Sequence, residues 1–318
     1  MSGLTVIIPA YNRAPILKKA LDGYRIQSRS GLIRELIVVD DGSTDNTEAV
    51  VEQVSTDCAF PVRYIRQSNR GPAAARNVGI REAQSQLILF TDSDIVPERD
   101  LVSQHVKWHS ENPDDYFAVL GYVTWPPEPK PTPFMKWYGE AGPLFAYQQF
   151  RNKREISYRF LYTCNLSFKT NFLRTHGQFD EDFKSAAWED MELGYRLSKA
   201  GLRLLYNPQA LAYHNQFFTF ADVCRKAKAN SSAKEIFAQK EAGIHFHKEQ
   251  QEKKANLGYR FAEWAAVVVG TVLRPANALM DSAVPLPAVV YRSLYWYYVN
   301  RFTDITDGFS NIAQSGSR

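Results

Sequence analysis

The chain has 318 residues, which is enough for one large α/β domain or for one domain with an extension. Its apolar content of 45% with 13% aromatic residues is typical of globular proteins and excludes a wholly disordered chain. The net charge of +4 is too small to indicate a nucleic-acid-binding protein, so no nucleic-acid partner is expected.

The first half of the chain alternates apolar runs with helical patterns. The apolar runs predict strands at 4–9, 36–40, 62–66 and 86–90. Segments with helical spacing follow the first three runs, and the third of these helices has Pro72 near its start, where a missing N–H costs little. Repeated strand–helix units of this kind predict an α/β fold with a parallel sheet covered by helices on both faces.

The second half is less regular. Five prolines between residues 125 and 134 predict a loop. An amphipathic helix is expected at 188–201, with Gly201 as its C-terminal cap. Further strands are expected at 160–170, 202–208 and 210–215. Beyond them the chain is expected to be helical, beginning with a basic segment at 221–260 that carries nine Lys or Arg against five Asp or Glu.

The cysteines and the N-terminus bear on localisation. Cys58, Cys164 and Cys224 lie far apart and show no metal-binding spacing, which fits a reduced compartment. The N-terminal segment lacks the basic region of a signal peptide. No stretch reaches the roughly 18 apolar residues that a transmembrane helix needs. A cytoplasmic protein is therefore expected.

Three polar segments directly follow predicted strands. They are residues 9–13, 40–43 and 92–94. In open parallel sheets, ligands bind outside the carboxyl ends of the strands. The three segments are therefore expected to form one shared site.

The last of these segments contains Asp92 and Asp94, separated by one residue. If the strand stayed extended, both carboxylates would face the same side and repel each other, which favours a nearby cation or a shifted pKa. Hard divalent cations such as Mg²⁺ and Mn²⁺ bind to a few protein oxygens and to substrate phosphates. Two aspartates separated by one residue are also common in turns. The position of Asp92 and Asp94 beside two other polar strand ends nevertheless favours a metal site.

Each remaining candidate has a structural and a functional interpretation. Asp40 and Asp41 are either part of a turn and helix cap or acceptors for a base N–H. Arg76, with Asn77, either meets solvent or points into the site. Glu189 and Asp190 lie in a first helical turn, where acids commonly stabilise the helix dipole. His214 ends a strand and is either a structural residue or a third metal ligand.

Taken in order, the motifs resemble those of family 2 glycosyltransferases with the GT-A fold. The match spans about residues 4 to 215, and each motif is loose alone whereas the ordered series is highly specific. The matching segments are "TVIIPAYNRAPIL", "LIVVDDGSTDNT", "RGPAAARNVGI", "LILFTDSDIVPERDL", "TCNLSFKTNFL" with "GQFDEDF", and "WEDMELGYRLSKAGLRL".

The resemblance implies a Rossmann-like, mostly parallel sheet flanked by helices. It implies a GT-A catalytic domain at 1–215, with a nucleotide-sugar-binding half at 1–95 and an acceptor and catalytic half at 96–215. Residues 216–318 are then a helical C-terminal extension.

The resemblance also implies roles for individual residues. The donor is expected to be a UDP-sugar, and the acceptor a hydroxyl of a glycan or of a lipid-linked molecule. Asp94 would ligate Mn²⁺ or Mg²⁺ at the diphosphate, Asp92 would face the ribose and the metal, and His214 would lie on the metal side. Asp190 would be the catalytic base, beside Glu189. The nucleotide-sugar-binding residues would be Pro9, Ala10, Tyr11, Arg13, Asp41, Arg76, Asp92 and Ser93, with Asp41 and Arg76 at the uracil.

Direct attack of an acceptor hydroxyl from the face opposite the leaving diphosphate inverts the anomeric centre, so an inverting transferase is expected. Two departures from the family pattern are visible. Cys164 replaces the usual Gly before the family's Asn, which keeps a small residue there. A "QxxRW" motif does not follow the Glu–Asp pair, which argues against a processive, membrane-embedded synthase.

Two other functions remain open. "DSDIV" also fits the motif of haloacid-dehalogenase-like phosphatases, with Asp92 as nucleophile, although here it follows the fourth strand and not the first. A non-catalytic sugar-nucleotide-binding protein is the other alternative. The aromatic and apolar segment 267–302 either packs on the catalytic domain, forms a homodimer, or lies with the basic segment on a membrane as a peripheral contact.

Overall fold

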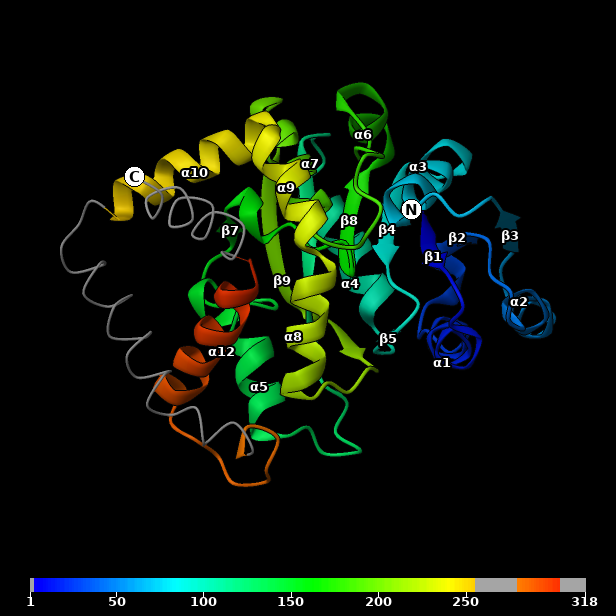
Figure 1. The fold of residues 1–318 in the computed structure, drawn as a ribbon. Helices are drawn as coiled ribbons and strands as arrows, with labels where there is room; N and C mark the ends of the chain where they lie inside the picture. Colours follow the sequence, from blue (N-terminus) through cyan, green and yellow to red (C-terminus); the bar gives the residue numbers. More distant parts are fainter. Residues whose placement is uncertain (1–2, 255–278, 304–318) are drawn as a thin grey trace, which may run out of the picture. The chain divides into compact units, whose positions relative to one another are not determined.

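The computed structural model describes residues 3–254 and 279–303, and the helices and strands are shown in Figure 1. The chain divides into two compact units. The first comprises Met1–Pro126 and Tyr147–Gln216, and the second Pro127–Ala146 and Phe217–Arg318. Residues 267–278 of the apolar segment predicted at 267–302 lie outside the described residues.

The first unit is built on one mixed sheet in the order β3-β2-β1-β4-β8-β6-β9-β5, with β7 paired to β9. The first four strands of the chain are parallel to one another, which confirms the predicted α/β fold with a Rossmann-like, mostly parallel sheet. They are β1 (Leu4–Ala10), β2 (Ile33–Asp40), β3 (Val62–Arg66) and β4 (Leu87–Thr91).

Beyond β4, antiparallel pairs enter the sheet. Strand β8 (Asn165–Lys169) is antiparallel to both β4 and β6 (Phe117–Thr124), and β9 (Arg203–His214) is parallel to β6. Strands β5 (Ile95–Pro97) and β7 (Glu155–Ile156) are antiparallel to β9. The two runs expected at 202–208 and 210–215 form the single strand β9.

The strand expected at 160–170 begins only at Asn165. The residues before it contain the short 3-10 helix η3 (Tyr158–Phe160), whose first turn is capped by the Ser157 side chain. Two other 3-10 helices are η1 (Ser30–Leu32) and η2 (Tyr147–Gln149).

The order of the parallel strands reverses at β1. The chain passes from β1 to β2 and β3 in one direction and then returns to β4 on the other side of β1. Right-handed crossovers put α1 (Ala14–Arg25) and α2 (Thr47–Ser55) on one face of the sheet and α3 (Pro72–Glu82) on the other. Figure 1 shows α1 and α2 together and α3 apart from them. The carboxyl ends of β1 and β4 therefore flank the point where strand order reverses, which is where such sheets bind ligands.

Helix α3 lies unusually close to the sheet. A Cβ atom added to Gly79 would be 2.4 Å from Cγ2 of Ile7 on β1. The preceding turn is also made of small residues, including Ala75, which packs on Ile37 and Val39 of β2. Small side chains on this face set the depth at which α3 is seated.

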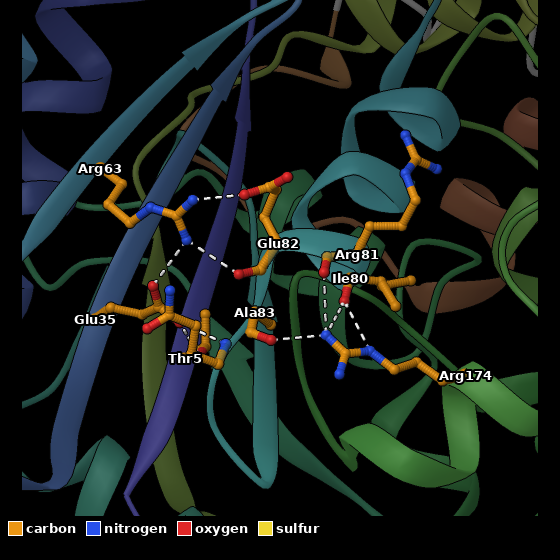
Figure 2. A network of polar contacts seen from close by, with 9 residues as sticks. Thr5, Glu35, Arg63, Ile80, Arg81, Glu82, Ala83 and Arg174 are labelled. Carbon is orange, nitrogen blue, oxygen red and sulfur yellow. Dashed lines mark hydrogen bonds and ion pairs between the residues drawn. The ribbon is translucent and has the colours of Figure 1, made fainter.

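The C-terminal end of α3 is fastened by a network shown in Figure 2. Arg174 donates to the carbonyl oxygens of Ile80 and Ala83 at 2.9 and 2.6 Å, a favourable position for a cation at the end of a helix. Arg63 pairs with Glu82 at 2.6 Å and with the buried Glu35 at 3.1 Å. These contacts fix the helix that carries Arg76.

The remaining helices of the first unit are α4 (Leu101–Glu111), α6 (Thr170–His176) and α7 (Glu189–Lys199). Two buried histidines of α4 brace strand β8: His105 and His109 both contact Oγ of Ser167, at 2.7 and 2.9 Å. Burial lowers the pKa of His105 to about 4 and that of His109 to about 3, so both rings are neutral at physiological pH.

The second unit is helical where it is described. Its helices are α5 (Pro133–Glu140), α8 (Phe220–Ala229), α9 (Ser231–Gln239), α10 (Glu241–Lys254) and α12 (Ala288–Thr303). An aromatic core joins three of them, with Phe134 and Trp137 of α5 packed against Phe220 of α8 and Tyr291 of α12. The proline-rich loop runs to Thr132, whose side chain caps α5. Among the helices of the described residues, none is long and apolar enough to cross a bilayer.

The seating of α3 can be tested by substitution of Gly79. Gly79→Ala adds a methyl group 2.4 Å from Ile7 and should lower the free energy of unfolding by about 1–3 kcal/mol, although Ala favours helix over Gly. Gly31→Ala is the matched control, because its Cβ would have no neighbour within 4 Å. Urea unfolding of both variants measures the difference. Equal stability of the two variants would contradict close packing of α3 on β1.

Candidate active site

The loops after β1 and β2 are joined at the carboxyl edge of the sheet. The backbone N–H of Asn12 donates to Oγ of Ser43 at 2.9 Å, and the N–H of Thr44 donates to Oδ1 of Asn12 at 2.8 Å. Asn12 has a φ of 50°, a left-handed conformation that Asn tolerates better than most residues. Beside it, 48% of the Tyr11 surface is exposed, so an aromatic side chain is available at the end of β1.

Asp40 and Asp41 are both buried at the end of β2 and serve different segments. Asp40 accepts hydrogen bonds from the backbone and hydroxyl of Ser43 and from the hydroxyl of Tyr64, which confirms its turn role. Asp41 accepts from the Gln67 side chain at 2.7 Å and from the backbone N–H groups of Arg70 and Gly71 at 2.8 Å. Asp41 thus closes the loop that leads into α3, and its contact with a base stays a prediction.

Asp92 and Asp94 lie in a turn that leads from β4 to β5, where the N–H of Ile95 donates to the carbonyl oxygen of Asp92 at 3.1 Å. The chain is therefore not extended here, and the condition under which both carboxylates would face the same side is not met. Each carboxylate instead meets its own arginine. Arg76 contacts Oδ1 of Asp92 at 2.8 Å, and Arg13 contacts Oδ2 of Asp94 at 3.2 Å.

Arg76 is buried, with only 2% of its surface exposed. The interpretation of this residue as a surface ion pair is therefore wrong. One terminal nitrogen contacts Asp92, the other contacts Oε1 of Glu189 at 3.0 Å, and the guanidinium lies 5.5 Å from the ring centre of Phe179. Its neighbour Asn77 bonds to the backbone of Phe179 in both directions, at 2.9 Å, and so holds the segment before α7 against α3.

Glu189 and Asp190 begin α7, directly after Trp188, which has a left-handed φ of 71°. Glu189 is buried, and its pair with Arg76 goes beyond a helix-dipole role. Asp190 is half-buried, and its carboxylate accepts from the N–H and the hydroxyl of Thr163 at 3.0 and 2.9 Å.

Burial shifts the pKa values of both acids upward. The pKa of Glu189 is raised, mainly by burial and further by Asp190, while Arg76 opposes the shift. Burial also raises the pKa of Asp190, against the lowering effects of Arg76 and of the hydrogen bonds from Thr163. A carboxyl group with a raised pKa, positioned by hydrogen bonds, is suited to proton transfer near neutral pH.

His214 lies beside the aspartate turn. It pairs with Ile95 in the β5–β9 ladder, and the N–H of the next residue, Asn215, donates to the carbonyl oxygen of Asp94 at 2.7 Å. Its ring meets Trp125 edge-on with the ring centres 5.3 Å apart. The structure thus brings His214 to the turn, and ligation of a metal by its ring stays a prediction.

The predicted strand-end segments do converge in the first unit. Two sets of ion pairs lie there: Arg13 pairs with Asp94, and Arg76 pairs with both Asp92 and Glu189. Asp190 follows Glu189 directly in the sequence. Within the described residues, no group of three or more His, Cys, Asp or Glu side chains could hold a metal ion alone. Pro9, Ala10 and Ser93 lie at the same strand ends.

Sequence reasoning missed the role of Thr163. The only available signal was its position two residues before the family's Asn, since a Thr at the start of a strand is common.

Comparison with known proteins places the chain in a family. The family described as "Glycosyl transferase family 2" matches residues 5–175. Validoxylamine A glucosyltransferase of Streptomyces hygroscopicus subsp. jinggangensis is 32% identical over 222 residues, which cover 63% of this chain and 52% of that protein. Chondroitin synthase of Escherichia coli is 27% identical over 246 residues, which cover 68% of this chain and 35% of that protein. The chain thus spans about a third to a half of these relatives.

Solved structures show the same fold. A mannosyltransferase, PcManGT, from Pyrobaculum calidifontis in complex with GDP-Man and Mn²⁺ has a TM-score of 0.61 at 22% identity, covering 97% of this chain and 88% of that one. TarS of Staphylococcus aureus in complex with UDP-GlcNAc has a TM-score of 0.54 at 16% identity, covering 97% and 92%. These likenesses confirm the predicted GT-A fold.

The central ion pairs lead to a prediction for Arg76. Arg76→Met leaves Asp92, Glu189 and Asp190 without their buried cation and should lower the free energy of unfolding by about 3–5 kcal/mol. Because burial raises the pKa values of Glu189 and Asp190, these groups take up protons as the pH falls, and the loss should be larger at pH 8 than at pH 5.5.

Arg81→Met is the matched control for Arg76→Met. Arg81 lies on the same helix but is exposed, so its removal should change stability by less than about 0.5 kcal/mol. Urea unfolding at the two pH values measures both variants. A loss for Arg76→Met that is the same at both pH values would contradict the assigned ionisation of the acids.

Proposed function

Because the chain belongs to glycosyltransferase family 2, we propose that it transfers a sugar from a nucleotide-sugar to a hydroxyl group of an acceptor. The observation that carries this proposal is the row of ion pairs that links the aspartate turn after β4, through Arg76, to the Glu–Asp pair of α7. A donor-side acid cluster and a base candidate are thereby held in one unit, at the edge where strand order reverses.

We propose a UDP-sugar as the donor. The exposed ring of Tyr11 at the end of β1 provides a stacking surface for a base, next to Pro9 and Ala10. Asp41 is the acceptor proposed for a base N–H; a carboxylate has about four acceptor sites, of which the protein uses three here. Structures with this fold contain UDP, UDP-GlcNAc or GDP-Man, and the group that these ligands share is a nucleoside diphosphate.

Arg13, Arg76 and Ser93 complete the proposed donor site. Arg13 is partly exposed and pairs with Asp94, so it is placed to meet a diphosphate. Ser93 lies in the turn between the two aspartates. A contact of Arg76 with uracil has to compete with its two ion pairs, and its first role in the proposal is to order the carboxylates around it.

The residues fit a divalent cation. Asp92, Asp94, Glu189 and Asp190 are four carboxylates that face two guanidinium groups, an excess of two negative charges when all are ionised. Arg76 and Arg13 each use one oxygen of Asp92 and Asp94, and the other oxygens accept no hydrogen bond within the described residues. We propose that Asp94 and Asp92, with His214 nearby, hold Mn²⁺ or Mg²⁺ together with the donor phosphates. Such a cation stabilises the negative charge of a departing nucleoside diphosphate.

We propose Asp190 as the general base and Glu189 as its buried neighbour. Glu189 is committed to Arg76, whereas Asp190 is half-buried and can be reached by an acceptor. The acceptor hydroxyl gives its proton to Asp190, its oxygen forms a bond to the anomeric carbon, and the electron pair of the broken C–O bond leaves with the diphosphate. One such displacement inverts the anomeric centre.

The alternative functions are less well supported. The haloacid-dehalogenase-like reading is not favoured, because the matched family and fold are those of glycosyltransferases. A non-catalytic sugar-nucleotide-binding protein would bind donor without transfer, and the Asp190 test below separates the two.

We also propose a glycan or lipid-linked acceptor. The second unit exposes apolar side chains, including Val284, Val289 and Trp296, and basic side chains on α8. Peripheral binding to an anionic membrane would use both kinds of side chain, and salt-sensitive binding to anionic vesicles would distinguish it from packing or a homodimer.

The role of Asp190 leads to a prediction. Asp190→Asn keeps the shape of the side chain but removes the base, so transfer should fall by about 10²–10⁴-fold while nucleotide binding is kept. Asp57→Asn is the control, because Asp57 is exposed in the turn after α2 and has no role in the proposed site. Transfer is measured with a panel of UDP-sugars and glycan acceptors. Transfer by Asp190→Asn at the wild-type rate would remove Asp190 as base.

A further inference from the structure

Thr163 lies at the same edge of the sheet as the aspartate turn. In the antiparallel pair β4–β8, Thr91 is opposite Asn165. The residues just before β8 therefore run beside those just after β4, which are Asp92 to Asp94. Thr163 is also deeply buried there, with 1% of its surface exposed.

Both hydrogen-bond donors of Thr163 converge on one carboxylate. Its N–H donates to Oδ2 of Asp190 at 3.0 Å, and its hydroxyl lies 2.9 and 3.0 Å from Oδ1 and Oδ2. A donor on the main chain and a second on a short, buried side chain leave the carboxylate little freedom to rotate.

The partners of Asp190 are unusual for its position. An acid in the first turn of a helix commonly accepts hydrogen bonds from the free N–H groups of its own helix. Asp190 is the second residue of α7, yet within the described residues its hydrogen bonds come from Thr163, which precedes another element. The carboxylate is thus turned toward β8 and the aspartate turn and away from its own helix end.

We propose that Thr163 is a positioning residue for Asp190. Thr163 orients the Asp190 carboxylate toward the acceptor hydroxyl and keeps this carboxylate ionised. This inference rests on the proposed function, in which Asp190 is the general base. A merely structural reading, in which the contact only ties α7 to β8, predicts a loss of stability and no change in the ionisation of Asp190.

The charged and titratable groups around Asp190 explain why Thr163 is needed. Burial raises the pKa of Asp190, Arg76 lowers it, and Asp92 and Glu189 are further carboxylates nearby. Burial also raises the pKa values of Tyr162 and Cys164, which flank Thr163, so both side chains are neutral near pH 7 and add no charge beside Asp190.

Arg76 is the cation of this environment, but it is shared. Its two terminal nitrogens contact Asp92 and Glu189. Thr163 supplies the hydrogen bonds that serve Asp190 alone, and these favour the ionised form.

The test compares variants at Thr163 by carboxyl NMR. Thr163→Val keeps the N–H and the shape but removes the hydroxyl, Thr163→Ser keeps both donors, and Thr163→Ala is a second variant without the hydroxyl. The protein is labelled with ¹³C at aspartate, and the Asp190 signal is identified by its absence in Asp190→Asn. Thr163→Val and Thr163→Ala should raise the pKa of Asp190 by about one to two units, while Thr163→Ser should leave it near the wild-type value.

Thr170→Val is the matched control. Thr170 is a buried threonine just beyond the other end of β8, and its hydroxyl donates to the carbonyl oxygen of Ser85 at 2.7 Å. It should destabilise the protein to a similar degree without moving the pKa of Asp190. An unmoved pKa in folded Thr163→Val, or an equal shift in Thr170→Val, would overturn the proposal.

Transfer assays separate this inference from the proposed function. If Thr163 keeps the base ionised, the acid side of the pH–rate profile moves to higher pH in Thr163→Val, and nucleotide binding does not change. An inactive Asp190→Asn together with a wild-type profile for Thr163→Val overturns the role of Thr163 alone. An active Asp190→Asn overturns the base assignment and the role of Thr163 with it.

Discussion

One buried guanidinium organises this molecule. Arg76 meets carboxylates from two other segments, Asp92 after β4 and Glu189 at the start of α7, and both pairs are shorter than 3.1 Å. A buried charge without partners is costly, and so is a group of carboxylates without a cation. The three segments therefore have to meet, and their meeting places the aspartate turn and Asp190 at one edge of the sheet. The close seating of α3 at Gly79 and the cap that Arg174 provides hold the arginine at the required depth.

In the same arrangement, the four acids have different partners. Glu189 is committed to Arg76, Asp190 is held by Thr163, and Asp92 and Asp94 each keep one oxygen that accepts no hydrogen bond within the described residues. Two acids adjacent in sequence thus differ in exposure and in partners, which is how a protein assigns different roles to chemically similar groups. In the proposed function, the aspartate turn faces the donor and Asp190 faces the acceptor.

The fold and the convergence of the strand ends could be predicted from the sequence, because strand periodicity and the rule for carboxyl ends depend on local pattern. The partners of the site residues could not. Arg76 had the pattern of a surface helix residue, and only the packing of α3 shows that it is buried. Whether the chain stays extended at Asp92 and Asp94 could not be decided from the sequence, and in the structure a turn follows Thr91 directly. Thr163 was missed because its contact joins segments 27 residues apart, a separation that no local pattern encodes. The grouping of 127–146 with the C-terminal helices likewise depends on aromatic packing across a long stretch of chain.

The central claim is that the aspartate turn binds a nucleoside diphosphate together with a divalent cation. Calorimetric titration of UDP, GDP and dTDP, with and without Mn²⁺, tests it most directly on the wild type and on Asp94→Asn. The account predicts that UDP binds best, that Mn²⁺ strengthens its binding, and that Asp94→Asn weakens the Mn²⁺-dependent binding by about tenfold or more. Binding that is indifferent to Mn²⁺ and unchanged in Asp94→Asn would contradict it.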